Sequence, residues 1–107
     1  MGAPFDKDAY HPLDTFAFEA LSVGTTAVGF TAATFGPSTG TPAILADFVV
    51  ESGAIRYRTD GTDPTAATGT PVEVGQQFTV WGTMDIRSFR AIRRDGVSAT
   101  LSTHFAR

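Results

Sequence analysis

Turn-forming residues divide this chain into short segments. Eleven Gly and six Pro are spread over 107 residues, and the stretches between them are short and often alternate in polarity. Gly and Pro interrupt helices, whereas the nine Phe and sixteen Thr are residue types that fit a pleated sheet. The frequent Gly and Pro and the abundance of Phe and Thr therefore predict an all-β chain and argue against a helical bundle. The length allows one domain.

Eight segments between the turns are strand candidates, so we expect seven or eight short strands. In the clearest, 54–59, Ile55 and Tyr57 point one way and Arg56 and Arg58 the other, as in a half-buried antiparallel strand. The remaining candidates are 15–22, 27–34, 44–52, 72–74, 77–81, 85–93 and 98–105. Together they predict a small antiparallel β-sandwich over residues 15–107, immunoglobulin-like or jelly-roll-like.

Three local signals refine this prediction. Residues 1–14 are expected to form an extended N-terminal arm, because the prolines in it prevent a regular element. Phe30 and Phe35 should anchor the Thr-, Ala- and Gly-rich stretch 23–43. Asp95-Gly96 predicts a two-residue hairpin between the last two strands, since Gly accepts the positive φ of such a turn.

Charge is distributed unevenly along the chain. Residues 1–53 hold one Lys and six acidic residues, a balance of −5, whereas residues 54–107 hold seven Arg and five acidic residues, a balance of +2, giving the net −3. Opposite charges on the two halves suit neighbouring molecules that dock the acidic half of one against the Arg-rich half of the next. Alternatively, one domain brings both halves together and the charges only solvate its surface. The negative net charge argues against nucleic acid, and no apolar run approaches the roughly 20 residues of a membrane helix. We expect neither partner.

Signals of enzymatic chemistry are weak, so we expect a protein that is not an enzyme and has no cofactor or metal. The chain has no Cys, and its two His residues, His11 and His104, stand in no catalytic or metal-binding motif. Asp60 and Asp63 in a Gly-containing loop could ligate calcium, but a tight turn explains the same residues. Trp81 with Tyr57 could form a sugar-stacking platform, although a lone Trp in a β domain more often belongs to a core or an interface.

The Arg-rich segment near the C-terminus is the strongest residue-level signal for a protein interface. If 85–93 is one strand, apolar and basic side chains occupy both of its faces, so it is either bulged near Ser88 or covered on both sides, once by another chain. The predicted interface consists of this segment and its extension, together with charged residues of the arm: Arg87, Arg90, Arg93, Arg94, Asp6, Lys7 and Asp8.

A second motif lies in the middle of the chain, and it resembles a known family. A strand that ends in Arg-Tyr-Arg is followed by Thr-Asp-Gly-Thr-Asp-Pro-Thr and a later Gly, and the motif residues are Arg56, Tyr57, Arg58, Asp60, Gly61, Asp63, Pro64 and Gly69. The motif is similar to part of the immunoglobulin-like domain of chitobiase and β-hexosaminidase. It more closely resembles small tailed-bacteriophage virion proteins, whose later QFTVWG-like, Ile-Arg-x-Phe-Arg and SATLSTHF-like segments match residues 77–82, 86–90 and 98–105.

The phage resemblance covers residues 44–107 and implies a structural role. Such proteins are virion components of β-sandwich type without enzymatic activity, and the motif residues would act as fold determinants. The expected function is capsid decoration, in which the protein cements the head shell, with a head–tail neck or tail accessory protein and a carbohydrate-binding accessory domain as alternatives. The expected partners are the major capsid protein, other virion proteins and further copies of the chain, in a virion assembled in the host cytoplasm.

Overall fold

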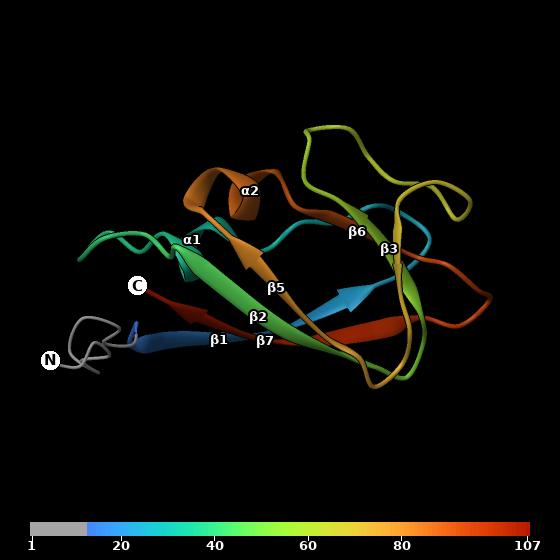
Figure 1. Ribbon diagram of the computed structural model, residues 1–107, viewed down its shortest axis with the longest axis horizontal. Helices are drawn as coiled ribbons and strands as arrows, with labels where there is room; N and C mark the ends of the chain where they lie inside the picture. Colours follow the sequence, from blue (N-terminus) through green and yellow to red (C-terminus); the bar gives the residue numbers. More distant parts are fainter. Residues whose placement is uncertain (1–12) are drawn as a thin grey trace, which may run out of the picture.

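The structure is a computed structural model that describes residues 13–107, and its strands form two layers (Figure 1). Within that range there are seven strands and two short helices, which confirms the all-β prediction. In chain order they are β1 (Thr15–Val23), α1 (Ala32–Phe35), β2 (Leu45–Glu51), β3 (Ile55–Arg58), β4 (Thr70–Val72), β5 (Gln77–Trp81), α2 (Thr83–Ser88), β6 (Arg90–Arg93) and β7 (Ala99–Ala106).

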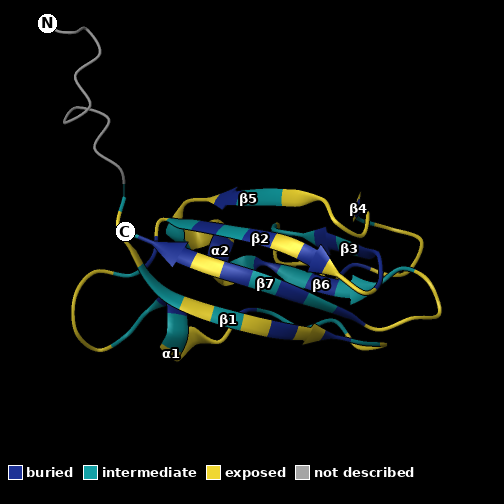
Figure 2. Ribbon diagram, turned by 90° about the horizontal axis from the view of Figure 1, so that it is seen from below, coloured by how far each residue is buried: buried dark blue, intermediate teal, exposed yellow. Residues whose placement is uncertain are grey.

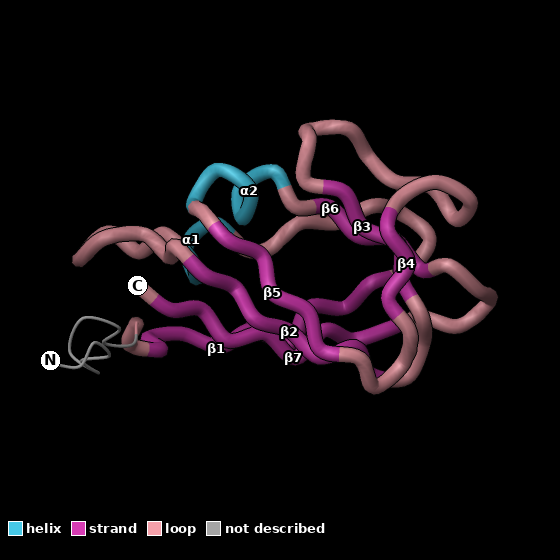
Figure 3. The backbone as a smooth tube through the Cα atoms, in the orientation of Figure 1, coloured by secondary structure: helices cyan, strands magenta, loops and turns pink. Residues whose placement is uncertain are grey.

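The two layers are antiparallel sheets of four and three strands. The larger has the order β1-β7-β2-β5 and the smaller the order β4-β3-β6. The last strand therefore lies between the first and the second, and the long β1–β7 pairing closes one side of the molecule (Figure 3). The predicted sandwich is confirmed.

An aromatic cluster fills the space between the sheets. Phe89 is fully buried at its centre, stacked on Phe30 with ring centroids 4.2 Å apart and on Tyr57 at 5.4 Å. Phe48 of β2 meets the Phe89 ring edge-on at 5.6 Å, and Phe105 of β7 meets Phe30 in the same way at 5.2 Å. The cluster therefore draws on both sheets, so the surplus of Phe in the composition serves the core.

Period-two alternation predicts two of the central strands correctly. In β2, Phe48 and Val50 are buried while Val49 and Glu51 are exposed. In β3, Ile55 and Tyr57 are buried and the two arginines of the strand are half-buried. These strands each face the core on one side only, and that is the condition under which alternation is informative.

The predicted strand 27–34 is wrong. Only Val28 pairs, in an isolated bridge to Ala91, and residues 32–35 form the short helix α1. Gly29 shows the close packing that its position suggested, because an added Cβ there would stand 2.8 Å from the carbonyl oxygen of Phe89. The segment connects β1 to β2, both of the four-stranded sheet, and on the way it meets β6 of the smaller sheet only at this one bridge. Phe30 and Phe35 are both buried and anchor it as expected.

The predicted strand 85–93 is also wrong, and its mixed pattern has a different cause. Residues 83–88 are helix α2, and the strand β6 begins only at Arg90. Ile86 and Phe89 are fully buried and lie three residues apart, a helical spacing. A single strand over 85–93 would carry apolar and basic residues on both faces because the backbone changes from helix to strand near Phe89. The mixed pattern therefore indicates neither a bulge nor a second covering chain.

The predicted hairpin at Asp95-Gly96 is wrong as well. β6 belongs to the three-stranded sheet and β7 to the four-stranded sheet, so this turn connects the two layers. At the other end, the predicted arm falls outside the described residues as far as residue 12. The described chain is tied down at Asp14, whose N–H and carbonyl oxygen both pair with the backbone of Arg107. Within residues 13–107 no helix is long and apolar enough to cross a membrane.

Candidate functional site

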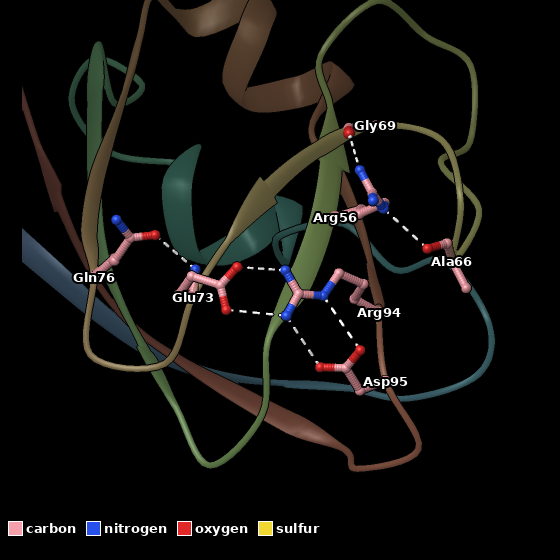
Figure 4. A network of polar contacts seen from close by, with 7 residues as sticks. All are labelled: Arg56, Ala66, Gly69, Glu73, Gln76, Arg94 and Asp95. Carbon is pink, nitrogen blue, oxygen red and sulfur yellow. Dashed lines mark hydrogen bonds and ion pairs between the residues drawn. The ribbon is translucent and has the colours of Figure 1, made fainter.

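The motif loop between β3 and β4 is held closed by one arginine (Figure 4). The Arg56 guanidinium donates from Nε to the carbonyl oxygen of Ala66 at 2.9 Å and from Nη1 to that of Gly69 at 2.8 Å. Both acceptors are backbone atoms, so the contact fixes the path of the loop irrespective of the side chains it displays. Gly69 adopts φ +132°, and an added Cβ would lie 3.1 Å from the carbonyl oxygen of Tyr57. The loop therefore requires Gly here for both its conformation and its space.

The start of the same loop is a tight turn built on Asp60. Its carboxylate accepts from Nε of Arg58 at 3.0 Å and from the backbone N–H of Thr62 at 3.2 Å. The Arg58 guanidinium, followed by the Thr62 N–H, lowers the pKa of Asp60 below its ordinary value. The turn interpretation of residues 60–63 is confirmed by these bonds, which engage the oxygens that a cation would need. Among the residues that the structure describes, no group of three or more His, Cys, Asp or Glu side chains could hold a metal.

A second polar network ties β4 to the connection between β6 and β7 (Figure 4). Arg94 forms a two-point ion pair with Glu73 and a second pair with Asp95 at 3.1 Å. The side chain of Gln76 accepts from the backbone N–H of Glu73 at 2.7 Å. The Arg94 guanidinium lowers the pKa of Glu73, and the two carboxylates raise the pKa of Arg94. These charges are paired within the chain.

The four arginines of the predicted interface are thus not one surface. Arg94 is engaged in the network above, and Arg93 is half-buried at the end of β6. Only Arg87, at the end of α2, and Arg90, at the start of β6, lie together. The predicted arm residues Asp6, Lys7 and Asp8 lie outside the described part of the chain.

Arg87 and Arg90 border an open pocket of about 550 Å³. Its other lining residues belong to helix α1 and the residues on either side of it: Gly29, Phe30, Ala32, Phe35 and Gly36. The Nη1 of Arg90 donates to the carbonyl oxygens of Phe89 at 2.7 Å and Arg87 at 3.1 Å, which holds its guanidinium at the rim. The ion pairs within residues 13–107 are made by Arg58 and Arg94, so neither arginine of the pocket has a carboxylate partner there.

The outer face of the four-stranded sheet is the other candidate surface, and Figure 2 shows its four strands side by side. Strand register places Phe18, His104, Asp47 and Thr79 in one row across β1, β7, β2 and β5. The next row along consists of Ala20, Ser102, Val49 and Gln77, and the pair Leu45 and Trp81 lies on the opposite side of the first row. Phe18 is 53% exposed, Trp81 63% and Val49 37%.

Five polar side chains of this outer face bond to one another. The Asp47 carboxylate accepts from Nε2 of Gln77 at 2.6 Å and from Oγ1 of Thr79 at 3.2 Å. Glu51 accepts from the Ser102 hydroxyl. A partner that covers this face would therefore leave few polar groups without a bond. The four strands carry no Lys or Arg, and the carboxylates of Asp47 and Glu51 are the charged groups of this face.

Trp81 and Tyr57 do not form a joint platform. Tyr57 is only 8% exposed in the core, and burial raises its pKa, whereas Trp81 stands on the outer face of the other sheet. The aromatic group that shares the outer face with Trp81 is Phe18, whose ring meets His104 edge-on at 5.1 Å. Sequence analysis missed Phe18, because alternation within β1 does not reveal which of its two sets of side chains faces inward.

Comparison with known proteins found no matching family model, no matching curated protein and no matching solved structure. The structure offers two features suited to binding: an outer sheet face with exposed aromatic groups, and a pocket lined by two arginines and two phenylalanines.

Proposed function

We propose that this protein is a non-enzymatic structural component of a tailed-phage virion, and that it acts as a capsid decoration protein on the head shell. The proposal combines the resemblance of residues 44–107 with the character of the outer sheet face. The motif residues make internal contacts such as the Arg56 clamp, as expected of fold determinants. In this proposal, binding uses surfaces other than the motif loop between β3 and β4.

The exposed aromatic face of the four-stranded sheet carries the proposal. A cement protein needs a rigid, mostly uncharged surface that can be covered by its neighbours, and this sheet is held in place along all four strands. Exposed aromatic residues contribute most of the binding energy in many interfaces, so Phe18 and Trp81 are the expected anchors. Weak contacts repeated over many copies become tight through multivalency.

Occupancy of purified particles tests this role. The double variant Phe18→Ser and Trp81→Ser should remain folded, because both side chains are more than half exposed, but should be lost from the particles. Met84→Ser is the matched control, since Met84 is an exposed apolar residue of α2 at 70% and lies off the sheet face. Full occupancy by the double variant would refute the docking face.

Copy number separates capsid decoration from the neck or tail alternative. A decoration protein is present in hundreds of copies per head, whereas ring components of the neck or tail are present in about six or twelve, following their cyclic symmetry. Quantitative mass spectrometry of whole particles gives this number. A count near that of a ring would replace the decoration assignment with the neck or tail assignment.

A carbohydrate-binding accessory domain is the second candidate, and the exposed Trp81 favours it. A Trp ring on a flat sheet face can stack on a sugar, and Gln77 and Thr79 stand on the same strand and face. A glycan array tests this function directly. Specific binding that disappears in Trp81→Ala would support it over the structural role.

A further inference from the structure

The pocket between helix α1 and the end of α2 combines two binding chemistries. Two of its lining residues are the core phenylalanines Phe30 and Phe35, which supply apolar contact. Its rim carries the guanidinium groups of Arg87 and Arg90. Arg binds carboxylates through paired, charge-assisted hydrogen bonds, which are shorter and stronger than neutral ones. The pocket therefore fits a segment that presents carboxylates beside an apolar or aromatic side chain.

Arg90 is positioned for such a ligand and has no carboxylate partner among residues 13–107. Its two hydrogen bonds to backbone oxygens both use Nη1, which orients the guanidinium plane. Gly29 lies directly beneath it, where an added Cβ would meet both the Arg90 side chain and the Phe89 carbonyl oxygen. The absence of a side chain at position 29 thus gives Arg90 its place at the rim.

The first twelve residues of the chain carry the complementary pattern. Asp6 and Asp8 are two residues apart, so in an extended segment they share one side, about 7 Å from each other, while Lys7 points away. In the same extended conformation Tyr10 would fall on the side of the two acids, and an aromatic ring suits contact with Phe30 and Phe35. A twelve-residue segment can span up to about 40 Å, which is long enough to reach a neighbouring molecule.

We propose that the pocket bordered by Arg87 and Arg90 binds the N-terminal segment of a second copy of this chain, with Asp6 and Asp8 facing the two guanidinium groups. This inference rests on the proposed function, in which copies stand side by side on one particle. It gives those copies a lateral link that is separate from the sheet face docked on the shell. Each chain offers one segment and one pocket, so the contact is head-to-tail and can continue around a ring or a lattice.

A peptide-binding measurement tests the chemistry. The probe is a labelled peptide with the sequence of residues 1–12, and the receptor is the full-length chain with Asp6→Lys and Asp8→Lys, whose own segment no longer competes. Saturable binding is expected in fluorescence anisotropy, and it should weaken with added salt. Adding Arg87→Glu and Arg90→Glu should weaken it about tenfold or more, because an exposed ion pair contributes up to a factor of about five and two such pairs are lost. Arg93→Glu in the same receptor is the matched control and should leave binding unchanged.

Two results would overturn this chemistry. One is the absence of saturable binding to a receptor whose circular dichroism spectrum is that of the natural chain. The other is undiminished binding after reversal of Arg87 and Arg90. A peptide that carries Asp6→Asn and Asp8→Asn should bind as weakly as the natural peptide binds the reversed pocket. Equal binding of both peptides would show that the carboxylates play no part.

Mixing two full-length variants tests whether the segment binds in a second copy. One variant carries Arg87→Glu and Arg90→Glu and keeps a natural segment, and the other carries Asp6→Lys and Asp8→Lys and keeps a natural pocket. Neither should associate alone, whereas the mixture should form a one-to-one complex in sedimentation velocity. Peptide binding without a complex in the mixture would mean that the segment, while attached to its own chain, does not reach the pocket of a second copy, which overturns the second-copy assignment. Both assays use protein in solution, so their failure is distinguishable from failure of the particle-occupancy test.

Discussion

Replacement of Phe89 by alanine removes the ring at the centre of the aromatic core. The ring is fully buried, lies between Phe30 at 4.2 Å and Tyr57 at 5.4 Å, and meets Phe48 edge-on. A phenylalanine side chain buries about 150–250 Å² of mostly apolar surface, worth about 4–6 kcal/mol at about 25 cal/mol/Å². Alanine keeps a methyl group, and Phe→Ala substitutions in cores cost about 3–5 kcal/mol. We expect a loss in that range.

Equilibrium unfolding in urea measures this loss. A domain of this size has a stability of about 5–15 kcal/mol, so Phe89→Ala should lower the midpoint greatly or leave the protein unfolded. Phe89→Leu keeps most of the buried volume and loses mainly the ring contacts of about 0.5–1.5 kcal/mol each, so it gives a measurable transition in either case. Phe18→Ala is the control, because this ring is more than half exposed and its loss should cost less than about 1 kcal/mol. Equal losses for Phe89→Leu and Phe18→Ala would refute the assignment of Phe89 to the centre of the core.

Three further predictions concern the polar networks. Arg56→Ala should destabilise the protein by about 0.5–1.5 kcal/mol and expose the loop 59–69 to proteases, because the carbonyl oxygens of Ala66 and Gly69 lose the donor that holds the loop closed. Gly69→Ala should reduce the thermal midpoint more than Gly61→Ala, since both glycines have positive φ but only position 69 lacks space for a Cβ. Glu73→Gln should flatten the pH dependence of unfolding below pH 4.5: the Arg94 guanidinium lowers the Glu73 pKa in the folded state, so the stability from this pair is present above the ordinary Glu pKa and is lost as the pH falls. An unchanged pH profile in Glu73→Gln would contradict that pairing.

The candidate sites differ in how far local sequence could predict them. The turn at Asp60 follows from the residues themselves, because Asp bonds to a backbone N–H two residues on wherever such a turn forms. Local sequence could not predict which of the arginines forms an ion pair and which bonds to backbone oxygens. Arg94 meets Glu73 across 21 residues of chain, while Arg90 turns to the carbonyl oxygens beside it, and nothing in their neighbourhoods in sequence distinguishes the two.

Turn positions and period-two alternation in the sequence determined the fold class, the strands β2, β3 and β5, and the core role of most Phe residues. Those signals are local, because side chains alternate about a single strand and Gly and Pro act on their own backbone. Only the tertiary structure decided that 83–88 is helical, that Asp95-Gly96 links two sheets, and that Phe18 lies on the same outer sheet face as Trp81. Each of these depends on which strands lie beside a segment, and strand pairing joins residues far apart in the chain. The exposed aromatic face and the Arg87–Arg90 pocket are consequences of that pairing.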